Sequence, residues 1–349
     1  MFAKKIKQYQ NNMKNLKYIL FTLAIISSSC SNDDRQTSDN EVTTKDIYIC
    51  GYGSDGDNYT PKYWKNGVAT FLTDGTATAI TAAGNDVYVA GYQSGIKGNF
   101  VAKYWKNGID VILTNGENFA QTNAITVVDN DVYVTGYENK GGVNVAKYWK
   151  NGKPVSLTDG TKIADAKAIA VVGNDVYVAG YEGNEIYTRI AKYWKNGKVV
   201  SLTDGTKDAE ANSITVIGND FYIAGYEHTS AKYWKNGVAT TITDGKRFAD
   251  AKAIAVVGND VYIAGYEEND KGITVAKYWK NGVDTPLTDG RRNAMVSAMA
   301  VVGNNVYVVG YERNDEGITI SKYWKNGVST VIENETKYSE ATGIFITTK

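Results

Sequence analysis

The sequence is short of several residue types, and each shortage excludes a class of function. Its 349 residues include one histidine and two cysteines, too few for a metal site built from histidine and thiolate ligands. A catalytic centre that needs an imidazole could use only His228. Lysine plus arginine (38) equals aspartate plus glutamate (38), so no basic surplus is present to bind nucleic acid. We therefore expect no metal, no other cofactor and no nucleic-acid partner.

No apolar run is long enough to cross a membrane as a helix. The longest near the N-terminus, residues 18–26, follows Lys14 and Lys17 and precedes the small residues 27–29. Nine residues span about 14 Å as a helix, against about 30 Å for a bilayer core. This arrangement predicts a cleaved signal peptide over residues 1–29. Met13 offers a second start, in which case residues 1–12 are a start-site artefact.

Cys30 directly follows the small residues and is followed by Ser-Asn-Asp-Asp. The segment resembles a bacterial lipoprotein signal of the kind found on surface-exposed lipoproteins of Bacteroidota, although Ser27 stands where an aliphatic residue is usual. The resemblance implies lipidation of Cys30 and a location at the bacterial outer membrane, exposed at the cell surface; a secreted protein is the alternative. Residues 30–45 are then the lipidated cysteine and a flexible polar tether.

The rest of the sequence repeats one unit seven times. The string Lys-Tyr-Trp-Lys-Asn-Gly contains every tryptophan and recurs every 40–45 residues, at Trp64, Trp105, Trp149, Trp194, Trp234, Trp279 and Trp324. A second string, Tyr-x-x-Gly-Tyr, precedes each copy. Each unit has four runs rich in Val, Ile, Tyr and Trp, as strands prefer, for example 168–172, 175–181, 190–195 and 198–203. We name these runs a, b, c and d; the Asn-Gly between c and d predicts a tight hairpin.

Four antiparallel strands in each repeat of 40–45 residues resemble a blade of the β-propeller superfamily. The first copy begins at run b (47–52), and the sequence ends with a lone run a (343–347). We therefore predict an all-β, seven-bladed β-propeller over residues 46–349. Its ring closes when the C-terminal run a joins the N-terminal runs b, c and d, which removes two free sheet edges. The familiar propeller motifs are missing, so the resemblance implies architecture and no activity.

The repeated residues are predicted to be structural. A buried tryptophan removes about 150–250 Å² from water, and seven similar units can reuse the same packing. The alternative is a ring of solvent-facing tryptophans that stack on sugars. The lysines that flank each Tyr-Trp are expected to be solvated. The Asp of the Leu-Thr-Asp-Gly motif is expected to stabilise a turn rather than bind calcium; it recurs at Asp74, Asp159, Asp204, Asp244 and Asp289.

A candidate binding surface follows from the connections. In a meander the b–c and d–a connections share one face, and here they are longer, variable and rich in extra aromatic residues. Candidate ligand-binding residues on this face are Tyr59, Phe119, Tyr187, Phe248 and Tyr338. A second candidate site is a polar ring where run a reaches the mouth of the central channel, formed by Thr78, Asn123, Lys167, Asn212, Lys252, Ser297 and Thr342.

These features favour a binding module over an enzyme. Asp165, Glu210, Asp250 and Glu340 share one register near the channel, where paired carboxylates could act on a polysaccharide. They are repeat positions rather than a unique constellation, so we expect no catalytic residue. We expect a monomer that recognises a glycan or an envelope or extracellular protein and contacts the membrane only through its lipid. A scaffold in an envelope complex and a polysaccharide hydrolase or lyase are the alternatives. The ligand, the face used and the number of sites stay open.

Overall fold

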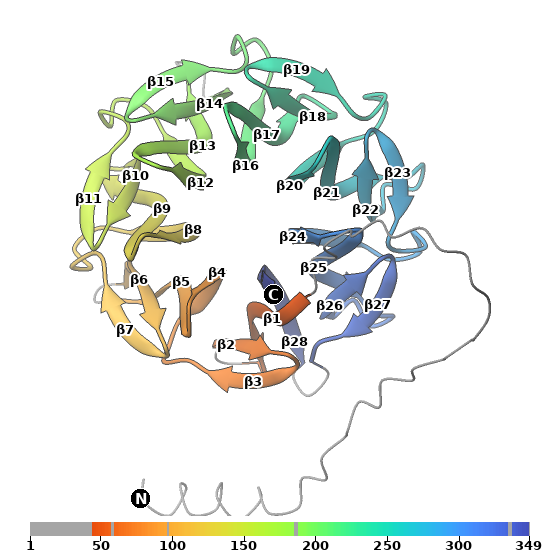
Figure 1. Ribbon diagram of the computed structural model, residues 1–349, viewed down its shortest axis with the longest axis horizontal. Helices are drawn as coiled ribbons and strands as arrows, with labels where there is room; N and C mark the ends of the chain where they lie inside the picture. Colours follow the sequence, from red (N-terminus) through yellow and green to blue (C-terminus); the bar gives the residue numbers. More distant parts are fainter. Residues whose placement is uncertain (1–43, 57–58, 96–97, 185–187, 334–336, 349) are drawn as a thin grey trace, which may run out of the picture. The chain divides into compact units, whose positions relative to one another are not determined.

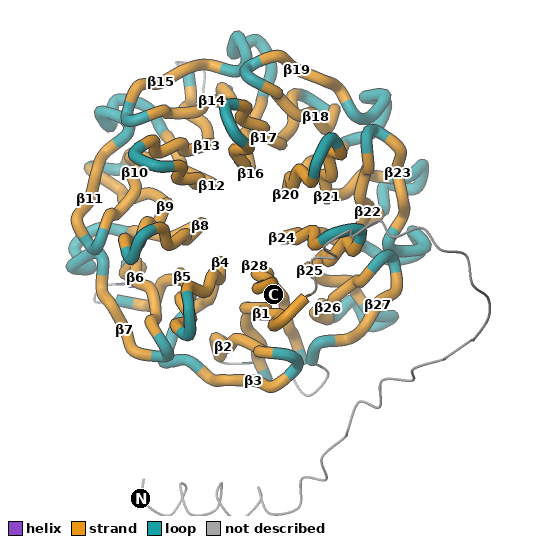
Figure 2. The backbone as a smooth tube through the Cα atoms, in the orientation of Figure 1, coloured by secondary structure: helices purple, strands orange, loops and turns teal. Residues whose placement is uncertain are grey.

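The computed structural model describes residues 44–348 except 57–58, 96–97, 185–187 and 334–336. This part of the chain forms 28 β-strands, arranged as seven four-stranded sheets around a ring (Figure 1). Figure 2 shows that strands make up most of the ring, with loops at the edges of the blades. Within the described residues, no helix is long and apolar enough to cross a membrane. The predicted all-β, seven-bladed architecture is confirmed.

Each blade is an antiparallel meander whose strands follow the order a, b, c, d from the centre outward, and blade 1 is the sheet β28-β1-β2-β3. The inner strands a, from blade 1 to blade 7, are β28 (Tyr338–Thr348), β4 (Thr76–Ala83), β8 (Ala120–Val128), β12 (Ala164–Val172), β16 (Ala209–Ile217), β20 (Ala249–Val257) and β24 (Ala294–Val302). Strands b are β1 (Thr44–Ser54), β5 (Asp86–Ser94), β9 (Asp131–Lys140), β13 (Asp175–Gly183), β17 (Asp220–Glu227), β21 (Asp260–Glu268) and β25 (Asn305–Arg313).

Strands c are β2 (Tyr59–Lys65), β6 (Phe100–Lys106), β10 (Val143–Lys150), β14 (Arg189–Lys195), β18 (Ser230–Lys235), β22 (Thr274–Lys280) and β26 (Thr319–Lys325). The outer strands d are β3 (Val68–Phe71), β7 (Ile109–Ile112), β11 (Lys153–Ser156), β15 (Lys198–Ser201), β19 (Val238–Thr241), β23 (Val283–Pro286) and β27 (Val328–Val331). We call the face with the a–b and c–d turns the turn face. The face with the b–c and d–a connections is the loop face.

The ring closes in blade 1, where the last strand pairs with the first. Strand β28 pairs antiparallel with β1, with Tyr48 opposite Phe345 and Ile49 opposite Ile344. The predicted closure by the C-terminal strand is therefore present. It leaves blade 1 with the same four strands as the other six blades.

The Asn-Gly pairs form the tight turns that the sequence predicts. In the copy at Asn196-Gly197 the two φ values are 52° and 78°, and the other six copies have the same left-handed geometry. Positive φ at both central residues matches the twist of the flanking strands. The asparagine side chain also links the c–d turn to the start of strand b. Asn196 Oδ1 accepts a hydrogen bond from Val176 N, and Nδ2 donates to Asp175 Oδ1 at 2.7 Å.

The tryptophans lie between neighbouring blades. All seven are at most 4% exposed. Trp149 of blade 3, for example, belongs to the same cluster as Tyr88 and Tyr104 of blade 2. This packing, repeated around the ring, makes the core a set of inter-blade layers. The tryptophans are therefore not platforms for a solvent-borne sugar.

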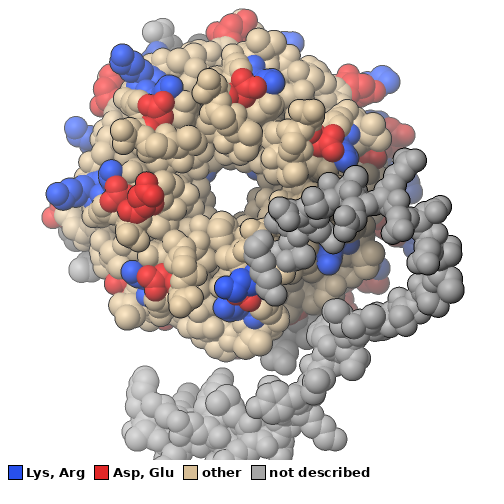
Figure 3. Space-filling model, viewed as in Figure 1, with Lys and Arg blue, Asp and Glu red and all other residues tan. Residues whose placement is uncertain are grey.

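The expectation that both flanking lysines are solvated is wrong for the first of each pair. Lys103 is fully buried, and in blades 3–7 the equivalent lysine pairs with the glutamate that follows the second tyrosine of strand b, as Lys277 does with Glu267 at 2.7 Å. A charge removed from water needs such a partner. The second lysine is about half exposed: Lys195 lies 2.9 Å from Asp175 and covers the ring of Tyr177. Figure 3 shows acidic and basic side chains recurring side by side around the ring, with an opening at its centre.

Candidate functional site

The seven residues of the predicted channel-mouth ring all lie at β-bulges of strand a. In blade 5, Ala211 pairs with Gly225 and Ser213 pairs with Ala224, so Asn212 between them has no partner on strand b. The same break in register occurs at the equivalent residue of each of the other six blades. A bulge bends its strand and re-aims a side chain. Here it presents one polar side chain per blade near the mouth of the channel.

Several of these side chains bind the next blade rather than solvent. Asn123 Nδ2 donates to Asp165 Oδ1 at 2.6 Å and to the carbonyl of the following residue at 2.9 Å. Asn212 makes the same two bonds to Asp250 and its successor, at 2.7 and 3.1 Å. Thr342 Oγ1 donates to a carbonyl of β4 at 3.0 Å. The ring is therefore an inter-blade belt in which much of the hydrogen-bonding capacity is already used.

A layer of tyrosines lies closer to the loop face. The second tyrosine of each strand b stands directly opposite one residue of strand a, as Tyr181 stands opposite Asp165 and Tyr52 opposite Glu340. Tyr52 donates to Glu340 Oε2 at 2.8 Å, and burial together with that negative charge raises the pKa of Tyr52 well above its ordinary value. The facing residue differs between blades, from 1 to 7: Glu340, Thr76, Gln121, Asp165, Glu210, Asp250 and Met295.

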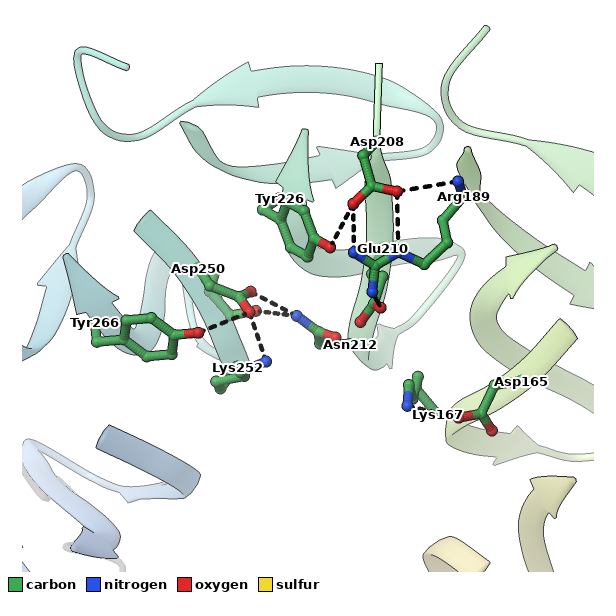
Figure 4. A network of polar contacts seen from close by, with 11 residues as sticks. Asp165, Lys167, Arg189, Asp208, Glu210, Asn212, Tyr226, Asp250, Lys252 and Tyr266 are labelled. Carbon is green, nitrogen blue, oxygen red and sulfur yellow. Dashed lines mark hydrogen bonds and ion pairs between the residues drawn. The ribbon is translucent and has the colours of Figure 1, made fainter. Parts of the chain in front are cut away.

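Three neighbouring blades place buried acids at this position (Figure 4). Asp165, Glu210 and Asp250 are all less than 9% exposed. Lys167 Nζ lies 2.6 Å from Asp165, and Lys252 Nζ lies 2.5 Å from Asp250. Burial raises the pKa of Asp250, and the charge of Lys252 only partly offsets this effect. For Lys167 the balance is reversed: burial opposes its charge, but the adjacent acids raise its pKa.

Arg189 of blade 4 joins this network across the junction with blade 5. It begins β14 and forms an ion pair with Asp208, which precedes β16, through Nε at 2.9 Å and through a second nitrogen; it also reaches Glu210. The guanidinium lies between the rings of Tyr181 and Tyr226, 5.7 and 5.8 Å from their centres. Burial alone would raise the pKa of Asp208, but the bonds from Arg189 hold it below its ordinary value.

The buried acids of this network are already paired with other groups of the protein. Each buried carboxylate has a cation within contact, and Asp250 also accepts a long bond from Tyr266 at 3.5 Å. In the described part of the chain no group of three or more His, Cys, Asp or Glu side chains is arranged to hold a metal ion. His228 is exposed at the tip of the β17–β18 hairpin with φ 58°. The network can fix blades 4–6 relative to one another.

The predicted loop-face aromatics fall into three groups. Phe119, Phe248 and Tyr338 are half-buried and pack on other rings; Phe119, for example, lies 4.5 Å from Phe100 between ring centres. Tyr59 is 58% exposed. Tyr187 lies outside the described residues.

Side chains of neighbouring blades also meet in pairs at three of the blade junctions, which was not predicted from the sequence. One position of each pair lies five residues before the repeat tryptophan, at the start of strand c. The other lies in the next blade, six residues before the isoleucine or methionine of strand a. Blades 2 and 3 place two aromatic rings there, Phe100 and Phe119, whereas blades 4 and 5 place the Arg189–Asp208 ion pair. At the junction of blades 6 and 7, Thr274 N and Oγ1 both donate to the Asn293 side chain. Residues of matching chemistry at these two positions are visible in the sequence of these three junctions, which is the signal that could have revealed them.

At the junction of blades 1 and 2 the same two positions hold Tyr59 and Asp74. Its d–a connection is four residues (72–75), whereas the five junctions from blade 2 to blade 7 use seven. By strand register, Gly75 is equivalent to Ala209 of blade 5 and Asp74 to Asp208. A cleft of about 690 Å³ opens here, lined by Tyr59, Thr60, Pro61, Leu72, Asp74, Gly75, Thr76, Tyr92, Ser94 and Phe100.

The fold is similar to that of solved propellers. The β-propeller domain of the Trilobed protease from Pyrococcus furiosus, which has an open velcro topology, matches with a TM-score of 0.53 and 11% identity over 84% of this chain and 97% of that one. A puromycin-hydrolyzing peptidase of Mycobacterium tuberculosis matches with a TM-score of 0.45 and 11% identity, over 74% of this chain and 53% of that one. No family model and no curated protein matches the sequence. At this identity the first likeness shows the propeller fold and no activity.

Proposed function

We propose that this protein is a non-catalytic binding module that recognises a glycan or a protein through its loop face. One observation carries the proposal: the two faces of the ring are built differently. The turn face repeats one Asp–Asn–Lys–Tyr arrangement with little change, as in the Asp175, Asn196, Lys195 and Tyr177 cluster. The loop face changes its side chains at each junction, and variable loops on a rigid scaffold are where binding proteins place their specificity.

The state of the acids supports binding over catalysis. A general acid or base must be able to reach the reacting atom and exchange a proton with it. Asp165, Glu210 and Asp250 are buried and engaged by lysine, arginine and asparagine side chains of the protein itself. Their arrangement suits the joining of blades.

The position of the first strand supports a tether at the turn face. Strand β1 begins at Thr44 opposite Thr348, and Asp46 accepts a bond from Asn66 of the adjacent c–d turn. The chain therefore enters the ring at the turn face. The tether that we propose for residues 30–45 would therefore join the ring on its turn face rather than on its loop face.

A binding screen of the full chain tests the module. We expect glycan-array and pull-down experiments to yield a ligand, and incubation with envelope polysaccharides to yield no cleavage products. Alanine at Tyr59, Phe119 and Phe248 together should weaken the interaction, provided that the circular dichroism spectrum is unchanged. Release of shortened sugars, lost on Asp250→Asn, would instead favour an enzyme.

A lipid-labelling experiment tests the tether separately. Cells grown with an alkyne fatty acid should label the wild-type protein, and Cys30→Ser should lose both the label and the membrane association. Cys50→Ser is the matched control, because Cys50 is buried in the ring. Labelling that persists in Cys30→Ser would contradict the anchor.

A scaffold in an envelope complex is the second candidate, and the outer rim favours it. The outer strands end the sheets with unpaired edges and expose aliphatic residues such as Val68 and Val328, each 72% exposed. Exposed edges of this kind can pair with another chain. A scaffold should co-purify with a fixed set of proteins whose binding survives changes on the loop face.

A further inference from the structure

The shortened connection between blades 1 and 2 brings Asp74 of the Leu-Thr-Asp-Gly motif to the register position that Asp208 holds in blade 5. Asp74 lies six positions before Ile80, whereas the equivalent Asp159 lies ten before Ile169. In blade 5 the motif aspartate is Asp204, and the junction position is filled separately by Asp208. A Cβ atom on Gly75 would lie 2.3 Å from the Tyr92 carbonyl oxygen, so no larger residue fits there without movement. One aspartate thus stands where blade 5 has two, and the cleft of about 690 Å³ opens beside it.

Aromatic rings stand on both sides of this cleft. Tyr59 contributes from blade 1 and keeps more than half of its surface exposed, although its ring touches Tyr52 at 5.3 Å between centres. Tyr92 and Phe100 contribute from blade 2, stacked on each other at 4.8 Å. At the next junction, by contrast, Phe100 and Phe119 are partly buried against each other, 4.5 Å between ring centres.

Asp74 is free of the turn that occupies its counterparts. Asp159 and Asp204 each accept the amide N–H of the residue two positions ahead, at 2.9 Å. After Asp74 that position is Thr76, the first residue of β4, and the turn does not form. Across the ranges that the structure describes, the Asp74 carboxylate makes no hydrogen bond. It lines the cleft as an exposed acceptor, with the hydroxyl groups of Thr60, Thr76 and Ser94 nearby in the lining.

The residues that line the cleft favour an uncharged ligand that carries hydroxyl groups. The lining holds no lysine, arginine or histidine, so it offers no counter-charge to a phosphate, sulfate or uronate. A carboxylate accepts hydrogen bonds from two hydroxyl groups, and aromatic rings cover apolar C–H surface. The cleft volume falls within the range of about 300–1,000 Å³ that is usual for small-ligand sites.

We propose that the cleft between blades 1 and 2 binds a neutral sugar ring, with Tyr59 packing on its apolar face and Asp74 accepting its hydroxyl groups. The proposal rests on the binding function proposed above and makes it specific: one site per molecule rather than seven. A seven-site alternative would need the cleft at every junction, and five of the other six junctions have the longer connection.

Calorimetry with the full chain tests this site. The titrants are neutral oligosaccharides of glucose, mannose, galactose and xylose, with an oligogalacturonate as the anionic comparison. We expect a stoichiometry near one for a neutral sugar, and at least a tenfold loss of affinity for Tyr59→Ala and for Asp74→Asn. Asp204→Asn is the matched control, because Asn115 makes the same turn naturally and this turn lies at another junction. It should bind like the wild type.

A second variant closes the cleft without removing a lining residue. Inserting Thr-Lys-Ile-Ala, the segment 161–164, between Gly75 and Thr76 gives this junction the length found in blades 2–7. We expect an unchanged circular dichroism spectrum and urea midpoint but no detectable sugar binding. Retained binding in this folded variant would overturn the site.

The remaining outcomes separate the site from the general function. A sugar that binds equally well to wild type, Tyr59→Ala and Asp74→Asn would leave the module standing and refute this cleft. Binding of the oligogalacturonate alone, or of a protein alone, would refute the neutral-sugar assignment. No binding of any titrant at millimolar concentration would refute it as well, whatever the pull-down shows.

Discussion

Arg189 and Asp208 belong to different blades, and their side chains meet in a two-nitrogen ion pair across the junction of blades 4 and 5. At the equivalent positions Phe100 meets Phe119, and Thr274 meets Asn293. Seven nearly identical repeats therefore carry different junction chemistry. These junction contacts differ between blades, whereas the tryptophan and tyrosine packing of the core is the same in each blade.

Arg189→Ala should destabilise the ring by about 1–3 kcal/mol, measured by urea unfolding. The variant leaves Glu210, whose side chain is 10% exposed, without its cation. Arg292→Ala is the control, because its partner Asp315 is 84% exposed and such a pair contributes less than about 1 kcal/mol. Equal effects in the two variants would contradict the cross-junction role of Arg189.

Asn212→Ala should cost about 1–3 kcal/mol of unfolding free energy, because it removes two hydrogen bonds to blade 6 and leaves the buried Asp250 with one donor fewer. Ser297→Ala changes the same bulge position in blade 7, where the described residues offer it no hydrogen-bond partner. It should change stability by no more than about 0.5 kcal/mol. A cost for Asn212→Ala as small as that of Ser297→Ala would mean that the belt does not bind the blades together.

Gly343 and Cys50 should behave as a compensating pair. They stand opposite each other in blade 1, where blade 2 has Ala79 opposite Ala90. A Cβ on Gly343 would lie 3.0 Å from Cys50 Sγ, so Gly343→Ala should cost about 1–3 kcal/mol through overpacking. Adding Cys50→Ala recreates the alanine pair of blade 2 and should recover part of that loss. Strictly additive unfolding energies in the double-mutant cycle would rule out the compensation.

The turn face should make the protein sensitive to acid. Hydrogen bonds from Asn196 and then Lys195 lower the pKa of Asp175, and the equivalent bonds lower that of Asp220. A lowered folded pKa stabilises the protein above the ordinary aspartate pKa, and this contribution is lost as the pH falls through the folded value. We expect the urea midpoint to fall between pH 5 and pH 3.

Replacing both acids by asparagine isolates their part of this effect. Blade 7 carries Asn305 at the same position and keeps the bond from Asn326 at 2.9 Å, so the turns should survive. The Asp175→Asn, Asp220→Asn variant should lose less stability than the wild type over the same pH range. An equal loss would assign the acid sensitivity to other groups.

The ring could be predicted from the sequence because its determinants are local. Strand runs, Asn-Gly turns and the unmatched runs at the two ends are all visible within single repeats. The burial of Lys103 could not be predicted from the sequence, because it depends on which face of strand c packs against the neighbouring blade at that position. The bulge at Asn212 and the contact of Arg189 with Asp208 depend on which residues of different blades meet. The cleft beside Asp74 has a visible cause, a connection three residues shorter than at most junctions, but this cause is recognised only by comparison with the other junctions.

The pairing of β1 with β28 has a consequence for biosynthesis. A ribosome makes the chain from its N-terminus, so Tyr48 is translated almost 300 codons before its partner Phe345. Until the final strand emerges, six blades can assemble while the first one presents a bare edge, and closing a loop of that length costs roughly 5 kcal/mol of chain entropy. Interrupted translation would therefore release an open ring with an adhesive edge, a natural substrate for chaperones and proteases.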